Sequence, residues 1–378
     1  MKAIVNGQVH QGDHFAQGQA LLFDEHILGL ADHVPEGVPQ IDARGGFVSA
    51  GLIDVHCHGF GGREAGDVGA EELAEMSREL SHYGVTAWLP TVSCLQWDRY
   101  EGCFADIGQA KSITSAQGFM GAQVLGAHAE GPFLNAQKCG AQNPDYILVP
   151  DWARAEKVLR HVRLMTVAPE GKDADDLIRH LTAAGITVSI GHTNANYAQA
   201  VAGIEAGATH ATHTFNAMPS LLHRQPGALG ALLNDSRVYC ELIADGFHVH
   251  PSLIALAARL KGDRLVLITD SIRFAGLPDG EYTIAGQTVT VKGIECRLPD
   301  GTIAGSTLTL DRAVRNARDL GGLTLAQALT AATESAAASI GEVGRGALRP
   351  GFAADIAIFD TDMMPQSTWV AGAEVWRR

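Results

Sequence analysis

The stretch GLIDVHCHG, residues 51–59, joins an apolar run to two histidines that stand one residue apart. Side chains alternate between the two faces of a strand, so positions two apart share a face. If Val55 faces the surrounding helices, His56 and His58 both point the other way. Two imidazoles side by side at the end of a buried strand are typical of a metal-binding pair. A lone His-x-His is more often two unrelated polar residues at a strand-to-loop junction, so the rest of the chain must decide.

The chain that follows alternates short apolar runs with helical patterns, such as 71–83, 173–184 and 197–206. Several of the helical patterns end in Gly, which is a common C-terminal cap. Eight runs have the length and composition of strands: 52–56, 85–89, 122–127, 162–167, 187–190, 208–212, 239–243 and 265–268. This alternation predicts a (βα)8 TIM barrel over residues 51–343. A doubly wound open sheet is the alternative, but no Gly-x-Gly-x-x-Gly follows an early strand.

The fold class expected for the whole chain is therefore α/β. The two ends of the chain predict a small β-sandwich domain made of residues 1–50 and 344–378. Asn6-Gly7 is a two-residue hairpin signal between the runs 3–5 and 8–9. A second hairpin is expected around residues 24–25, and strands are expected at 355–359 and 368–370. Residues 281–304 interrupt the barrel pattern with hairpin-like segments, which indicates an insertion after the eighth strand.

The composition excludes several classes of protein. The chain has 378 residues, 46% of them hydrophobic and 19% charged, and a net charge of −14. An acidic chain argues against a nucleic-acid partner, and any anionic substrate must be captured by a local site. The six cysteines show no paired spacing. No basic-then-apolar leader follows Met1, and no apolar run approaches the roughly 20 residues of a membrane span. We therefore expect a cytoplasmic protein without a membrane partner.

Metal-compatible side chains recur where the predicted strands end. They are His56, His58, Glu130, His192, His213 and Asp270. In a barrel the carboxyl ends of the strands meet at one face, where active sites lie. Nitrogen and oxygen ligands of this kind suit zinc or iron, so the sequence predicts a divalent metal site. We assign the nearby His128 and His210 to supporting or packing roles.

This pattern, together with a flanking β-sandwich, resembles the amidohydrolase superfamily. Five motifs resemble more narrowly the N-acetylglucosamine-6-phosphate deacetylase family: HAEGPF (128–133), GHTNA (191–195), THTFNAMP (212–219), IADGFHV (243–249) and GSTLT (305–309). The resemblance runs along nearly the whole chain. It implies metal-dependent hydrolysis of the acetamide of N-acetylglucosamine-6-phosphate, giving glucosamine-6-phosphate and acetate in amino-sugar catabolism.

The resemblance also implies roles for the metal-compatible residues. Glu130, His192 and His213 would hold the metal that activates the hydrolytic water. His56 and His58 match family members with a second metal, which Glu130 and Asp270 could share, so one or two Zn²⁺ or Fe²⁺ ions are expected per subunit. Asp270 would be the general base that passes a proton from water to the leaving amine.

Other residues are expected to contact the substrate. His248 would help polarise the acetamide carbonyl. The resemblance assigns the phosphate to the backbone around Asn216 and Ala217 and to the side chain of Arg224, whose planar fork of donors suits phosphate. In this family the corresponding arginine commonly reaches in from a neighbouring subunit, which implies a homodimer. Gln142, also expected at the substrate, stands where some close members have His.

Three alternatives remain open from the sequence. The segments 279–283 and 241–246 resemble N-acetylgalactosamine-6-phosphate deacetylases at least as well, so the sugar epimer is undecided. A hydrolase of cyclic amides would use similar metal ligands but would not need Arg224. A catalytically dead barrel serving as a scaffold would typically lose ligands, whereas this chain keeps all of them.

Overall fold

Parallel strands arranged as a nearly closed barrel form the centre of the computed structural model, which describes residues 1–284, 287–299, 301, 303 and 305–378. The strands follow in sheet order: β8 (Leu52–Cys57), β11 (Val85–Val92), β12 (Gln123–Val124) with β13 (Ala127–Ala129), β14 (Val162–Val167), β15 (Thr187–Ile190), β16 (His210–Ala211), β17 (Tyr239–Ile243) and β18 (Leu265–Ile268). The third barrel position is divided into two short strands, and both of them pair with β11.

The first and last barrel strands meet and close the sheet. The Asp270 backbone N–H donates to the His56 carbonyl at 2.9 Å. The Thr269 hydroxyl donates to Asp54 Oδ2 at 2.6 Å. The predicted barrel is therefore confirmed, and the open sheet is excluded. Cys57, between the two histidines, is buried in the surrounding apolar core, as strand alternation requires.

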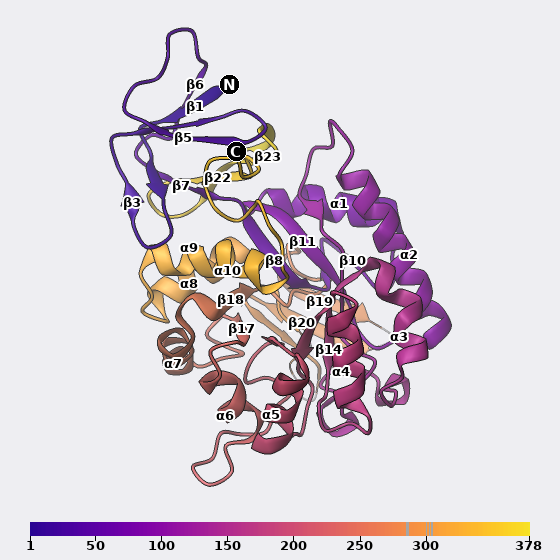
Figure 1. Ribbon diagram of the computed structural model, residues 1–378. Coiled ribbons are helices and arrows are strands. Elements are labelled where there is room, and N and C mark those ends of the chain that lie inside the picture. Colours follow the sequence, from indigo (N-terminus) through magenta and orange to yellow (C-terminus); the bar gives the residue numbers. More distant parts are fainter. Residues whose placement is uncertain (285–286, 300, 302, 304) are drawn as a thin grey trace.

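Helices cover the outside of the barrel (Figure 1). They are α1 (Ala70–Ser81), α2 (Trp97–Thr114), α3 (Trp152–Val158), α4 (Ala174–Ala183), α5 (Tyr197–Ala206), α6 (Gly227–Asn234), α7 (Pro251–Lys261), α8 (Leu310–Asp319), α9 (Leu325–Ala332) and α10 (Glu334–Ser339). Short 3-10 turns add η1 (Ala136–Lys138), η2 (Pro144–Tyr146), η3 (Leu159–His161) and η4 (Gly262–Arg264). None of the helices in the described residues is both long and apolar enough to span a bilayer.

Strands from both ends of the chain form two further sheets beside the barrel. One has the order β5 (Ile27–Ala31), β4 (Ala20–Phe23), β1 (Lys2–Val5), β6 (Gln40–Asp42). The other has the order β24 (Ala373–Arg377), β23 (Pro365–Val370), β22 (Ile356–Phe359), β7 (Phe47–Ala50), β2 (Gln8–His10), β3 (Phe15–Ala16). In Figure 1 the indigo and yellow segments lie together, because β7 pairs with β22.

The shared module of the two chain ends is thus confirmed, with its own apolar core around Phe23, Val48 and Trp369. The exact division at residues 50 and 344 stays a prediction. The hairpin expected around residues 24–25 is present, since β4 and β5 pair antiparallel.

The prediction of a hairpin at Asn6-Gly7 is wrong. β1 pairs with β4 and β6, whereas β2 pairs with β3 and β7, so the two strands lie in different sheets. Asn6 does adopt the turn conformation, with φ 54°, and its side chain donates to Asp42 Oδ1 at 3.0 Å. The turn carries the chain from one sheet to the other, because the parallel partners β6 and β7 supply the backbone hydrogen bonds that a hairpin would have supplied.

The insertion after the eighth strand is confirmed as a small antiparallel sheet of β19 (Gly280–Ile284), β20 (Gln287–Lys292) and β21 (Glu295–Arg297). Parts of the predicted segment, residues 285–286, 300, 302 and 304, lie outside the described residues. The Arg297 guanidinium lies over the Phe247 ring, 4.6 Å from its centroid, so the insertion packs against the loop after β17. A second short hairpin, β9 (Gly59–Phe60) with β10 (Arg63–Glu64), follows β8.

Candidate metal centre and active site

The predicted metal-compatible residues lie together at the carboxyl ends of the barrel strands, and all of them are buried except Asp270, which is partly exposed. His56 is within β8 and His58 follows it. Glu130 comes directly after β13. His192, His213 and Asp270 each lie two residues beyond the end of their strands, β15, β16 and β18.

One half of the cluster consists of Glu130, His192 and His213. Glu130 Oε1 lies 3.0 Å from Nε2 of each of the two histidines. The two Nε2 atoms are 2.9 Å apart. Three potential ligand atoms thus surround one point.

The other half consists of His56, His58 and Asp270, and again borders Glu130. The Nε2 atoms of the two histidines are 3.1 Å apart, and Asp270 Oδ1 lies 3.3 Å from each of them. Glu130 Oε1 is 3.4 Å from His56 Nε2, and its Oε2 is 3.4 Å from His58 Nε2. Glu130 therefore lies between the two halves.

This donor set fits a divalent cation. Ligand bonds of about 2.0–2.2 Å in a tetrahedral arrangement place the ligand atoms about 3.3–3.6 Å from one another, close to the spacing found here. Imidazole nitrogens that face each other at about 3 Å present lone pairs toward the same point, which repel unless a proton or a cation lies between them. Imidazole and carboxylate ligands suit zinc and iron among other metals.

Three of these residues have an unusual backbone. His192, His213 and Asp270 adopt φ values of 46°, 27° and 49°. Positive φ is uncommon for residues other than glycine and costs on the order of 1–3 kcal/mol at each position. The strain is found just after the strands, where the chain must turn while the side chain stays over the barrel mouth. Its concentration in the cluster indicates a functional site.

The electrostatics of the cluster favour positive charge. Burial opposes the protonation of His58, but its hydrogen bond to Asp270 and the charge of Glu130 outweigh burial and raise its pKa to about 9. Burial likewise opposes the protonation of His213, and its hydrogen bond to Glu130 raises its pKa to about 9. Burial alone would raise the pKa of Asp270, yet the neighbouring histidines lower it to about 2. The carboxylates thus attract cationic partners, a role that a metal ion would take.

Hydrogen bonds to the Nδ1 atoms, on the side of each ring away from the cluster, orient the imidazoles. His192 Nδ1 lies 2.7 Å from the Lys138 carbonyl, and His58 Nδ1 lies 3.2 Å from Ser93 Oγ. His56 Nδ1 lies 2.9 Å from Oε2 of Glu241, a residue that the sequence analysis did not select. A signal was present, because Glu241 is the one charged residue in the otherwise apolar run 239–243.

Gln142 lies against the cluster. Its Nε2 donates to Glu130 Oε2 at 2.7 Å, and its Oε1 accepts the Cys94 backbone N–H at 2.8 Å. The amide thus ties Glu130 to the loop after β11. The expected contact of Gln142 with the substrate stays a prediction.

The remaining predicted residues lie in loops that follow the strands. His248 follows β17, and its Nδ1 lies 2.6 Å from Asp245 Oδ2, which holds the ring in place. Asn216 follows His213 and donates through its backbone and side chain to the His213 carbonyl. The Ala217 carbonyl accepts the Thr193 N–H at 3.2 Å, so the loops after β15 and β16 are connected.

Arg224 is exposed, unlike the clustered residues, and lies on the loop between β16 and α6 that projects at the lower edge of Figure 1. It lines a cavity of about 750 Å³ together with Asn194, Pro219 and Leu222.

His128 and His210 lie inside the barrel, where their ring nitrogens form hydrogen bonds with hydroxyl groups. His128 Nε2 is 2.9 Å from Thr166 Oγ1, and His210 Nδ1 is 3.2 Å from Ser189 Oγ. These contacts match the supporting and packing roles expected for them.

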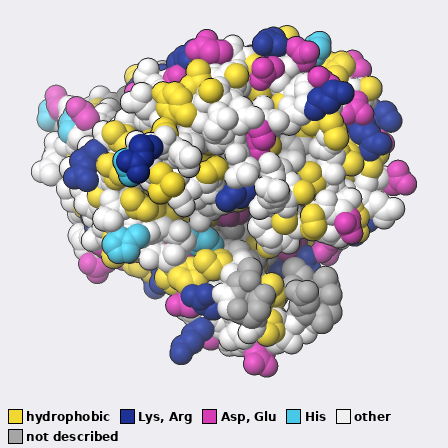
Figure 2. All heavy atoms as spheres, turned by 90° about the horizontal axis from the view of Figure 1, so that it is seen from below, with side chains coloured by type: hydrophobic (Ala, Val, Ile, Leu, Met, Phe, Trp, Pro, Cys, Tyr) yellow, Lys and Arg dark blue, Asp and Glu magenta, His cyan; other side chains and the backbone are white. Residues whose placement is uncertain are grey.

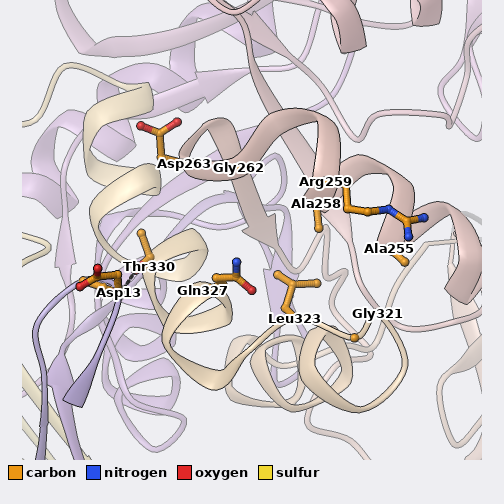
Figure 3. A pocket seen from close by; sticks show the side chains of 12 residues that line it. Asp13, Ala255, Ala258, Arg259, Gly262, Asp263, Gly321, Leu323, Gln327 and Thr330 are labelled. Atoms are coloured by element: carbon orange, nitrogen blue, oxygen red, sulfur yellow. Dashed lines mark hydrogen bonds between the residues drawn. The ribbon is translucent and has the colours of Figure 1, made fainter.

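A different cavity, of about 490 Å³, lies between α7, α9 and the segment after β2 (Figure 3). Gln327, Thr330 and Arg259 line it. Gly262 and Asp263 also line it, and because they immediately precede β18 the cavity lies toward the amino ends of the strands. It is therefore separate from the cluster.

Comparisons with known proteins agree with this geometry. The amidohydrolase family model matches residues 47–375. The chain is 36% identical to an N-acetylgalactosamine-6-phosphate deacetylase of Escherichia coli O157:H7, over 92% of this chain and 94% of that protein. It is 35% identical to an N-acetylglucosamine-6-phosphate deacetylase of Lysinibacillus sphaericus, over 92% and 91% of the two chains.

The solved structures give the same answer. The crystal structure of N-acetylglucosamine-6-phosphate deacetylase from Pasteurella multocida superposes with a TM-score of 0.93 at 29% identity and covers all of both chains. The family predicted from the motifs is confirmed. The chain belongs to the amidohydrolase family, and within it to the group that contains the N-acetylglucosamine-6-phosphate and N-acetylgalactosamine-6-phosphate deacetylases.

Proposed function

We propose that this protein hydrolyses the acetamide of N-acetylglucosamine-6-phosphate to glucosamine-6-phosphate and acetate, using one or two bound divalent ions, with zinc as the first candidate. The observation that carries the proposal is the convergence of four histidines on Glu130 at the barrel mouth, with Asp270 beside two of them, His56 and His58. The names of the similar proteins supply the substrate class.

Hydrolysis of an unactivated amide needs a nucleophile at neutral pH, charge stabilisation on the carbonyl oxygen and a proton for the departing amine. A bound divalent metal lowers the pKa of water toward about 7 and acts as a Lewis acid. Glu130, His192 and His213 would hold the first ion. His56 and His58 would hold a second, shared with Glu130 and Asp270.

We assign both proton transfers to Asp270. Its Oδ1 lies at the barrel mouth within 3.3 Å of both His56 and His58, where it can take a proton from the attacking water and return it to the amine. His248, whose Nδ1 is held by Asp245, would help polarise the acetamide carbonyl.

The phosphate would be bound by the Asn216-Ala217 segment and Arg224. In the view of Figure 2, acidic and basic side chains are interspersed, and no single sign dominates that face. With a net charge of −14, capture of an anionic substrate therefore depends on local donors. The exposure of Arg224 is compatible with its reaching a neighbouring subunit's site in a homodimer. A cytoplasmic location stays a prediction from the sequence.

N-acetylgalactosamine-6-phosphate is the second candidate substrate, favoured by the 36% identity to the Escherichia coli protein of that name. Acetate release from both sugar phosphates at equal enzyme concentration decides between them. We expect His192→Ala to lose metal and activity together. If metal-replete enzyme releases acetate from neither sugar phosphate, the proposed function is wrong.

A further inference from the structure

We propose that Glu241 is a positioning residue that holds both halves of the metal centre and thereby determines how tightly the protein retains metal. The inference rests on the proposed function, because it concerns the ions that this function requires.

Glu241 occupies a costly position. It lies in β17 and is fully buried. Its neighbours Cys240 and Leu242 belong to the apolar core around the barrel, so alternation turns Glu241 to the inside. Burying a carboxylate is strongly unfavourable unless its oxygens receive hydrogen bonds or charged partners. The partners of Glu241 therefore indicate what the residue is for.

The first partner is the His56 side chain, with 2.9 Å between Nδ1 and Glu241 Oε2. A carboxylate accepts hydrogen bonds, so Nδ1 carries a proton, and Nε2, 3.4 Å from Glu130 Oε1 and 3.3 Å from Asp270 Oδ1, is the atom left to bind a metal. A carboxylate behind a metal-binding histidine fixes its tautomer and ring orientation and increases its basicity.

The second partner is the backbone of His213, whose N–H donates to the same Oε2 at 2.8 Å. His213 is the residue with φ 27°, in the other half of the cluster. A hydrogen bond to a charged acceptor at this point stabilises the strained turn that aims the His213 imidazole at Glu130.

Glu241 thus differs from the other orienting groups. Ser93 and the Lys138 carbonyl each hold one histidine, and both are uncharged acceptors. Glu241 Oε2 touches His56 in one half and His213 in the other. Its Oε1 has no hydrogen-bond partner among the described residues and lies 3.6 Å from His210 Nδ1. The hydrogen bonds of this buried carboxylate are therefore directed to the metal centre.

The test compares Zn²⁺ retention by Glu241→Gln and Glu241→Ala with that of the wild-type holoenzyme. Zinc per chain is measured after gel filtration, and Zn²⁺ transfer to a chromophoric chelator gives the affinity. Gln keeps an oxygen for both N–H donors and loses the charge, so we expect Zn²⁺ affinity to fall about 10–100-fold. Glu241→Ala removes both hydrogen bonds, so its Zn²⁺ affinity should fall further, in both halves of the metal centre.

Ser189→Ala is the matched control. It removes a buried hydroxyl of the same barrel interior, which lies 2.6 Å from Thr212 Oγ1 and 3.2 Å from His210 Nδ1 and contacts no proposed ligand. We expect the Ser189→Ala variant to retain as much Zn²⁺ as the wild-type protein. Melting temperatures show that each variant is folded, and if Glu241→Ala does not fold, Glu241→Gln decides.

Wild-type retention in the folded Gln variant, or an equal loss in Ser189→Ala, would overturn the inference. Failure of the proposed function would look different, because the wild-type protein itself would then bind no Zn²⁺ or release no acetate.

Discussion

Asp270 is the residue whose chemical role can best be separated from metal binding. Asn is nearly isosteric with Asp but cannot accept a proton at neutral pH. If Asp270 moves the proton, kcat of Asp270→Asn should fall by at least about 10²–10⁴ while KM changes little.

Metal analysis of the same Asp270→Asn protein separates its two proposed roles. A variant that keeps its metal and loses turnover has lost the proton transfer, whereas a loss of metal indicates a ligand. Should Asp270 only cap its loop, the variant would lose some stability and retain a kcat within tenfold of wild type. That result would remove Asp270 from the mechanism.

Arg224 tests the phosphate assignment. Losing one charged hydrogen-bonding partner costs roughly 1.5–3 kcal/mol, so Arg224→Ala should raise KM for the 6-phosphate sugar about ten- to a hundredfold. The unphosphorylated sugar offers no phosphate to bind, and its steady-state constants should barely change. Equal losses on both substrates would show that Arg224 does not bind the phosphate.

At the scale of elements, the contact between the two chain ends depends on a glycine. Gly372, in the turn between β23 and β24, has φ +72°, and a Cβ there would stand 1.7 Å from the Asp24 carbonyl oxygen in the turn between β4 and β5. Gly372→Ala must therefore separate the two turns. We expect the free energy of unfolding in urea to fall by more than about 1 kcal/mol.

Gly37→Ala is the control for this substitution. Gly37 has a similar φ of +78° and nothing within 4 Å of its Cβ position. It carries the backbone cost without the clash, so it should lose clearly less stability than Gly372→Ala. If the two variants unfold alike, the close approach of the turns contributes nothing.

At the scale of the whole molecule, the exposed position of Arg224 leads to a prediction about assembly. In a dimer with Arg224 acting across subunits, an Arg224→Ala subunit would have an intact Asp270 and could borrow the arginine of an Asp270→Asn partner. At substrate concentrations far below KM, where Arg224→Ala is also slow, mixing the two variants under exchange conditions should then restore up to about a quarter of wild-type activity. No recovery in mixtures that demonstrably form heterodimers would place Arg224 in its own subunit's site.

Much of the barrel could be read from local patterns. The runs 162–167, 187–190, 239–243 and 265–268 coincide with β14, β15, β17 and β18, because short apolar segments between helices have few other ways to bury themselves. The segment 122–127 was less well predicted. Gly126, with φ 145°, divides it, and the second piece is β13 at 127–129.

The sequence by itself determined which residues would meet at the barrel mouth. A side chain at the carboxyl end of a parallel strand is placed at one face by topology alone, so His56, Glu130, His192, His213 and Asp270 could be grouped without coordinates. The set of donor atoms in the cluster therefore followed from side-chain type and position along each strand.

Only the tertiary structure decided which groups support that cluster and how the terminal strands pair. Glu241 faces His56 across 185 positions of sequence, and Gln142 folds back onto Glu130. The turn at Asn6-Gly7 leads into another sheet, because distant parallel partners outcompete the local hairpin. The physical reason is common to all three: hydrogen bonds between segments far apart in the chain depend on where the closed barrel and the two terminal sheets place them, and no local pattern encodes that placement.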